Sequence, residues 1–274
     1  MNSVALTTGM RNALFSIGDI DAQTNVANKR LATGKRVNDI LDNATNFFQA
    51  RGFTQLGTDL NTLTDNISLN IKTLEVTTKA LDGIEKLLSA ALGLIRQGRS
   101  LAATAPERTT LNTQATTALS QLTLLANDAS FNGKNLLKAT PDSLQINFNT
   151  EVGAALTFLT VAGVDTTNGA TGLNITIAGT TDINLDAAIT AITSAIDTVR
   201  TRGSTFASAI AIAQTRQDYN KGKTQSLKTA ADVLTIADIN EEGANLAALQ
   251  TRQQLAVQAL SLANRSDQGI LRLF

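Results

Sequence analysis

The residue types that most often carry catalysis and metal binding are missing from this sequence, which contains no histidine and no cysteine. Histidine acid–base catalysis, cysteine nucleophiles, disulfides, thiolate zinc sites and haem ligation by either residue are therefore excluded. Carboxylates and lysines remain as candidate catalytic groups. However, no acidic cluster has the spacing of a metal-binding loop, and no glycine-rich phosphate loop follows an expected strand. We predict a protein that is not an enzyme and that needs no cofactor or metal.

Charge and hydropathy argue against two further classes of partner. The 23 basic and 23 acidic residues cancel, and they alternate along the chain, which is typical of solvated helix faces rather than of a nucleic-acid surface. No apolar stretch reaches the roughly 18 residues that a membrane-spanning helix needs. Polar residues also interrupt the start of the chain, so we expect no signal peptide, which taken alone indicates a cytosolic protein.

An apolar repeat, rather than a catalytic motif, is the regular feature of both ends of the sequence. Apolar residues recur there at spacings that alternate between about three and four residues. These spacings keep the apolar residues on one side of a helix, as in coiled coils. At the front the positions are Leu6, Met10, Ala13, Ile17, Ile20, Ala27 and Leu31, with Thr24 in the one polar slot. Near the end they are Leu246, Leu249, Ala256, Leu260, Ala263, Ile270 and Phe274, with Gln253 and Asp267 in register. We expect these two segments to pair with each other or with neighbouring copies of the chain.

The same repeat predicts long helices between the ends. An unbroken series predicts a helix over 53–103, roughly 75 Å long, which must lie along partner helices because a globule cannot bury so long a seam. Pro106 ends that helix, and a shorter one is expected over 107–129. A third series, over 189–234, is polar at three positions. The three polar positions are Gln217, Asn220 and Thr224. Either their side chains are buried in the seam and set the helix register, or this part of the helix is locally exposed.

Period-two patterns between the helical blocks predict short strands at Ser143–Asn149, Ala155–Ala162 and Leu173–Ala178. The polar stretch Asp165–Gly179, rich in glycine, threonine and asparagine, is expected to be the most exposed part of the chain. The predicted fold is mainly α, with long antiparallel coiled-coil helices and a small β-hairpin or strand region in the middle.

Three segments of this sequence, at 30–44, 131–137 and 244–274, carry motifs that together resemble those of one family, bacterial flagellin, the subunit of the flagellar filament. RLATGKRVN at 30–38, followed by Asp42-Asn43-Ala44, resembles the family's signature between its first two helices. FNGKNLL at 131–137 resembles the turn after the third helix, and 244–274 resembles the C-terminal signature almost throughout. The resemblance implies that the family's signature turns here consist of Gly34, Asn38, Asp42, Phe131, Asn132 and Gly133. Of these, Gly34 can adopt a positive φ at the end of the first helix, and Asn132-Gly133 is a strong turn dipeptide.

The resemblance implies a domain arrangement. Residues 1–34 and 238–274 would be the two coiled-coil helices of an inner terminal domain, and 35–237 a long-helix domain with its strand region at about 140–186. The segment between the helical halves is too short for the outer domains of long flagellins, so a short, nearly core-only type of alphaproteobacterial kind is expected. In the family, the terminal helices are largely disordered in the free monomer and fold on assembly.

The resemblance also implies partners and a location. The chain would form a helical homopolymer outside the cell, and the cytosolic indication reverses because flagellins are exported through the flagellum without a cleaved signal peptide. The implied partners are the flagellar export apparatus, a secretion chaperone, the filament cap and the hook-junction proteins, with no nucleic acid and no membrane insertion. Many flagellins carry a charged segment that an animal immune receptor recognises, and in the corresponding segment 87–97 Ala90, Leu92 and Gly93 replace the charged residues, so weak or absent recognition is expected.

Two other functions compete with that of a filament subunit. A hook–filament junction protein would share both terminal signatures, although the dense matches at 244–274 favour flagellin. A helical signalling or adaptor protein would explain the heptads but not the turn motif or the paired signatures. Flagellins with a zinc-protease insert need histidine ligands, which this sequence lacks.

Overall fold

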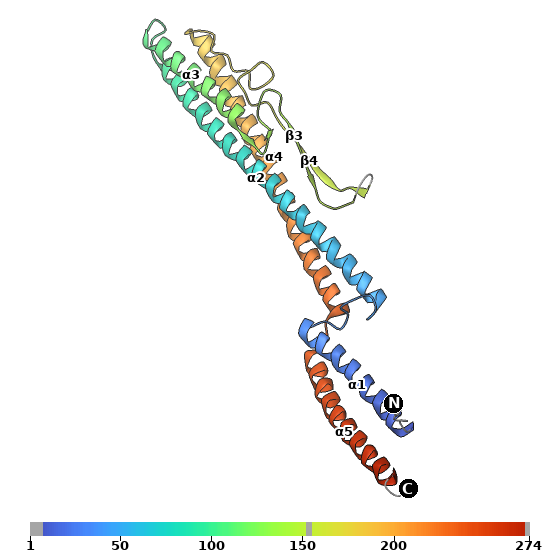
Figure 1. Cartoon of the computed structure of the whole chain (residues 1–274). Coiled ribbons are helices and arrows are strands. Elements are labelled where there is room, and N and C mark those ends of the chain that lie inside the picture. The colour runs from blue at the N-terminus through green and yellow to red at the C-terminus, as the bar shows by residue number, and fades with distance from the viewer. Residues whose placement is uncertain (1–7, 152–154, 272–274) are drawn as a thin grey trace. The chain divides into compact units, whose positions relative to one another are not determined.

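The computed structural model describes residues 8–151 and 155–271, with side chains described as far as residue 265 (Figure 1). Five helices dominate these residues: α1 (Thr8–Thr33), α2 (Ala44–Ser100), α3 (Glu107–Asp128), α4 (Asp182–Thr235) and α5 (Ile239–Leu271). Four short strands form two antiparallel pairs: β1 (Ser130–Phe131) with β2 (Lys134–Asn135), and β3 (Ser143–Asn147) with β4 (Phe158–Ala162). The predicted mainly helical fold is therefore confirmed.

The chain forms two compact units, which are described separately. One consists of Met1–Leu56 with Ser226–Phe274, and the other of Gly57–Gln225. Helices α2 and α4 each contribute to both units, because their ranges cross the boundaries between them. None of the helices in the described ranges is long and apolar enough to cross a membrane.

The predicted apolar seam of α2 lies at the centre of the second unit. Helix α2 has 57 residues and is about 85 Å long. It begins before the expected residue 53 and ends just before the expected residue 103. Its seam residues within the second unit are buried among α2, α3 and α4, which supply a thin core of aliphatic side chains. These residues are Leu60, Leu63, Ile67, Leu74, Leu81, Ile84, Leu88, Ala91 and Ile95.

The polar positions in the α4 seam are not an exposed stretch. Asn220 is 2% exposed, and its amide nitrogen donates a hydrogen bond to the main-chain oxygen of Phe148 at 3.2 Å. The Gln217 amide donates to the hydroxyl of Ser68 and to the main-chain oxygen of Thr64. Because its partner satisfies the buried amide, the interpretation as a buried polar group holds for Asn220 and the exposed alternative is wrong for it. Gln217 and Thr224 are half-buried.

The β3–β4 hairpin confirms two of the three predicted strands. Its register pairs Ser143 with Ala162 and Asn147 with Phe158, so Leu144, Ile146 and Val161 point to the buried face. Figure 1 shows the hairpin lying beside α4. The alternation of apolar and polar residues predicted this arrangement, because successive strand residues point to opposite faces.

The predicted third strand and the exposed stretch around it are both wrong. Residues 173–178 are irregular, and Thr166, Thr167 and Ile175 within 165–179 are buried. The Asn168 side chain makes two hydrogen bonds to the main chain of Ile175, and the Asn168 main-chain nitrogen donates to the Thr123 hydroxyl of α3. Side chains thus satisfy the loop's main chain, which lets a polar segment pack against a helix without forming a strand.

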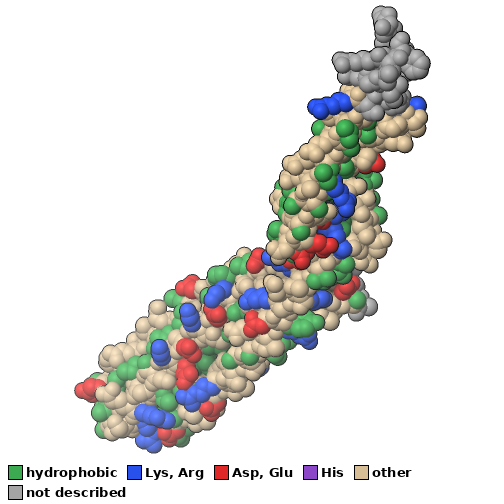
Figure 2. Space-filling model, turned by 90° about the horizontal axis from the view of Figure 1, so that it is seen from below, with side chains coloured by type: hydrophobic (Ala, Val, Ile, Leu, Met, Phe, Trp, Pro, Cys, Tyr) green, Lys and Arg blue, Asp and Glu red, His purple; other side chains and the backbone are tan. Residues whose placement is uncertain are grey.

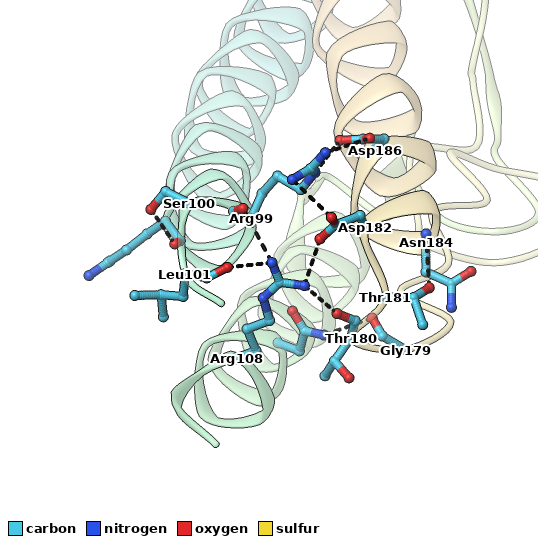
Figure 3. A network of polar contacts seen from close by, with 12 residues as sticks. Arg99, Ser100, Leu101, Arg108, Gly179, Thr180, Thr181, Asp182, Asn184 and Asp186 are labelled. Carbon is cyan, nitrogen blue, oxygen red and sulfur yellow. Dashed lines mark hydrogen bonds and ion pairs between the residues drawn. The ribbon is translucent and has the colours of Figure 1, made fainter. Parts of the chain in front are cut away.

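A buried arginine joins the end of α2, the start of α3 and the start of α4 (Figure 3). The Arg108 guanidinium donates to the main-chain oxygens of Leu101 at 2.5 Å and Thr180 at 2.7 Å. It also forms an ion pair with Asp182 at 2.8 Å, and the Arg108 side chain is only 2% exposed. Arg99, which is much more exposed, completes the cluster through Asp182 and Asp186.

Candidate functional site

The two terminal helices form an antiparallel pair. Figure 1 shows α1 and α5 side by side. Arg30 contacts Glu242, and Asp21 contacts Gln253. Lower residue numbers on α1 therefore lie beside higher residue numbers on α5. The structure therefore brings together the two segments whose apolar repeats match.

The predicted seam positions lie on the less exposed side of the terminal helices. On α1 the described seam residues are half-buried or buried: Met10, Ala13, Ile17, Ile20, Thr24, Ala27 and Leu31. On α5 the same holds for Leu246, Leu249, Gln253, Ala256, Leu260 and Ala263. Leu6 and Phe274 lie outside the described residues, as does the side chain of Ile270.

The seam of the terminal pair is thin. Of its described members, Ala27 is 1% exposed and Leu249 is 2% exposed, while the others keep part of their surface in contact with solvent. Several of these residues are alanines, whose burial removes little apolar area from water. Helix α1 and helix α5 therefore stabilise each other only weakly when no other chain is present.

Large apolar side chains also remain on the outward faces of the pair. Phe15 is 73% exposed and Leu262 is 70% exposed. Five more such residues are exposed on the same two helices: Leu14, Val26, Ile239, Leu255 and Val257. Exposed apolar residues repeated along a thinly packed helix pair are typical of a surface that another protein covers.

Polar contacts fix the register of the pair. Arg30 Nη1 lies 2.7 Å from Glu242 Oε1, and the two side chains are 30% and 11% exposed. Farther along, the Gln253 amide donates to Asp21 at 2.6 Å. A largely desolvated ion pair tolerates few alternative alignments, because sliding one helix would leave a charge unpaired.

Gly34 makes the turn that ends α1. Its φ is +67°, which favours glycine, and nothing lies within 4 Å of the position that a Cβ would occupy. Next to it, Lys35 forms an antiparallel bridge with Ile236, and Ala237 donates its main-chain N–H to Gly34 at 3.0 Å. The link from α1 to α2 is thus tied to the link from α4 to α5.

Asp42 organises the rest of this first turn region. Its carboxylate accepts the main-chain N–H groups of Asn38 at 2.8 Å and Asp39 at 3.2 Å. The Asn38 side chain donates to the main-chain oxygen of Lys35 at 2.8 Å. The Lys29 ammonium donates to Asp39 at 2.6 Å, which lowers the pKa of the Asp39 carboxyl and raises the pKa of Lys29. These contacts define the local conformation between α1 and α2.

The second turn motif belongs to the other unit. Asn132 and Gly133 have φ values of +49° and +74° and form a two-residue turn between β1 and β2, in which Phe131 pairs with Lys134. Asn135 follows, and sequence reasoning missed its role. Its buried side chain donates to the main-chain oxygens of Ala126 and Asn127 at the end of α3, and it accepts two main-chain N–H groups. Asn135 thereby closes the C-terminus of α3.

Charged side chains do not gather into a patch of one sign on the face shown in Figure 2, where basic and acidic groups are interspersed. Among the side chains that the structure describes, no group of three or more carboxylates is placed to hold a metal ion. The geometry offered by the terminal pair is therefore a surface for packing, built from apolar side chains and a few register-setting polar contacts.

Two family models match this chain. The model of the bacterial flagellin N-terminal helical region covers residues 7–142, and that of the C-terminal helical region covers residues 185–274. The matches include α1 with the first turn motif and α5, as well as the second turn motif.

Curated relatives match along the full length. Flagellin FljM of Caulobacter vibrioides is 29% identical over 282 residues, covering 100% of this chain and 99% of the relative. A flagellin of Brucella melitensis is 26% identical over 289 residues, with the same coverage of both chains. Among solved structures, the crystal structure of Bacillus cereus flagellin matches 57% of this chain and 88% of its own, with a TM-score of 0.49 and 18% identity.

Proposed function

Since the chain belongs to the bacterial flagellin family, we propose that it polymerises into the flagellar filament through its paired terminal helices. Its function is that of a structural filament subunit outside the cell, and no catalytic step is required. The relatives reported above are named as flagellins, which favours the filament subunit over the hook–filament junction protein.

The observation that supports assembly through α1 and α5 is the mismatch between their inner and outer faces. The inner seam is thin and partly solvated, whereas Phe15 and Leu262 project outward with most of their surface exposed. A pair built in this way gains more from burial against neighbouring copies than from its own seam. We assign residues 1–34 and 238–274 to this terminal coiled coil, and 35–237 to a long-helix domain.

The turn residues have a supporting role in this proposal. Gly34, Asn38 and Asp42 hold the link from the terminal pair to α2 through main-chain hydrogen bonds. The export apparatus, a secretion chaperone, the filament cap and the hook-junction proteins are the partners that we propose, with export that involves no cleaved signal peptide. These partners follow from family membership.

A charge substitution tests the assembly surface. Leu262→Glu places a carboxylate on the outward face of α5, and Gln254→Glu adds the same charge at an exposed polar position of the same helix. If neighbouring copies bury Leu262, the loss of its burial alone costs about 1.5–3 kcal/mol, so seeded elongation slows by roughly tenfold or more. Gln254→Glu should elongate at close to the parent rate.

Light scattering with filament seeds measures these rates, and far-UV circular dichroism of each monomer checks that helix content is retained. Parent-like elongation by Leu262→Glu would show that the outward face of α5 is not buried in the filament. Deleting 260–274 provides the stronger perturbation, which should abolish elongation and leave the second unit, Gly57–Gln225, folded.

A further inference from the structure

The chain contains two Asn-Gly dipeptides, Asn132-Gly133 and Asn168-Gly169, in very different surroundings. Glycine after asparagine exposes a main-chain nitrogen that no Cβ shields. That nitrogen can attack the asparagine Cγ. The new N–Cγ bond closes a succinimide ring, the Cγ–Nδ2 bond breaks, and ammonia leaves with the proton from the glycine nitrogen. Water then opens the ring at either carbonyl and produces aspartate or isoaspartate.

Asn168 is held in a conformation that opposes this reaction. Its amide nitrogen donates to the main-chain oxygen of Ile175 at 3.0 Å, and its amide oxygen accepts the Ile175 N–H at 2.6 Å. Its own main-chain nitrogen donates to the Thr123 hydroxyl at 3.0 Å. A Cβ on Gly169 would lie 3.3 Å from the Thr167 hydroxyl oxygen, so a side chain already crowds the Gly169 main chain. Both amide hydrogen bonds must break before Cγ can meet the glycine nitrogen.

Asn132 has none of these restraints. Both Asn132 and Gly133 are exposed, and nothing lies within 4 Å of the position that a Cβ on Gly133 would occupy. Within residues 8–151 and 155–271, the Asn132 side chain makes no hydrogen bond. The turn that holds it joins two strands of only two residues each, so rotation of the Asn132 main chain disturbs few contacts.

We propose that Asn132 is a site of spontaneous deamidation in the folded protein and that the fold protects Asn168. The reagents are the chain itself and water, and the inference does not depend on filament assembly. The isoaspartate product would lengthen the main chain of a two-residue turn by one methylene. That turn sets the position of Asn135, whose side chain closes the end of α3.

The two sites differ enough for a direct comparison within one molecule. Opening two ordinary hydrogen bonds suppresses the reactive conformation of Asn168, so we expect deamidation at Asn132 to be roughly thirtyfold faster in the native chain. In the unfolded chain both dipeptides are equally accessible, and the rates should converge to within about threefold.

The experiment incubates the full-length monomer in heavy-oxygen water at mildly alkaline pH, with and without guanidinium chloride. Peptide mapping by mass spectrometry then quantifies the exchange of the amide NH2 for labelled hydroxyl at each asparagine. The expected result is a large excess at Asn132 in the native sample and near-equal rates in the denatured sample. Equal native rates would overturn the proposal, and so would a difference that persists on unfolding, since local sequence would then explain it. An Asn132→Gln variant verifies which peptide carries the label.

Discussion

Replacing Arg108 with methionine should destabilise the second unit strongly, because this buried guanidinium binds main-chain oxygens in the α2–α3 turn and before α4. The Arg108 side chain is 2% exposed and donates to the main-chain oxygens of Leu101 and Thr180. Methionine keeps most of the aliphatic volume but supplies no donor. The substitution therefore isolates the polar contribution of Arg108.

The size of the effect follows from those contacts. Each hydrogen bond from a charged donor contributes about 1.5–3 kcal/mol. The two short ones to Leu101 and Thr180 are lost, together with a longer one to the main-chain oxygen of Arg99 at 3.4 Å. Removing a buried charge also relieves its desolvation cost, which offsets part of this loss. Asp182, which is 48% exposed, regains water and adds little. We expect a net decrease of about 2–4 kcal/mol in the free energy of unfolding.

Arg99 provides the matched control. It pairs with Asp182 and Asp186 in the same cluster, but it is considerably more exposed than Arg108. Arg99→Met should therefore leave the stability close to that of the parent. Urea denaturation of the monomer followed by far-UV circular dichroism measures both variants. A decrease for Arg108→Met below about 0.5 kcal/mol, or equal effects of the two substitutions, would refute this reasoning.

Three further predictions follow from contacts in the turns. Asn135→Ala removes a buried side chain with four hydrogen bonds and should lower the free energy of unfolding by about 2–4 kcal/mol. The control, Asn149→Ala in the exposed hairpin loop, should lower it less. Equal losses for the two variants in urea denaturation would contradict the assigned role of Asn135. Gly34→Ala places a Cβ at a φ of +67° with open space around it, so it should cost about 1 kcal/mol by calorimetry through backbone strain alone, and a loss as large as that of a core substitution would be inconsistent with that geometry. The main-chain N–H of Asn135 and the Lys138 ammonium lower the pKa of Asp142 from its ordinary value of 3.8, and Lys29 does the same for Asp39. Because the unfolded chain then binds more protons, the stabilisation by these carboxylates is present above about pH 4 and is lost as the pH falls below it. Denaturation midpoints should accordingly drop in acid, and an Asp142→Asn variant should show a smaller drop; an unchanged pH profile for that variant would contradict the assignment.

The helices and the terminal seam could be predicted from sequence because a helix with one buried face repeats its apolar residues every three to four positions. Every described seam residue of α1, from Met10 to Leu31, lies on the less exposed side of its helix. The strands β3 and β4 were visible for the same reason, since period-two alternation places Leu144 and Val161 on one face. Both are regular elements whose repeating pattern arises from burial of one face.

The packing of the loop over 165–179 and the Arg108 cluster could not be predicted from the periodicity of residue types. Composition made the loop seem exposed, yet the Asn168 side chain satisfies the main chain of Ile175 and lets the segment pack. Arg108 reaches the main-chain oxygen of Thr180, 72 residues away, and any residue type could supply that oxygen. Because main-chain groups are the same for nearly every residue type, hydrogen bonds to them cannot be recognised from the sequence pattern. Only the structure shows these contacts.

Seeded growth imaged by electron microscopy tests the assembly claim most directly. Purified protein of this one sequence is added to short filament fragments, and the parent is compared with Leu262→Glu and Gln254→Glu. We expect long helical filaments from the parent and from Gln254→Glu, and few or none from Leu262→Glu. Failure of the parent chain to elongate seeds, or equal elongation by all three proteins, would contradict assembly through the outward face of the terminal helix pair.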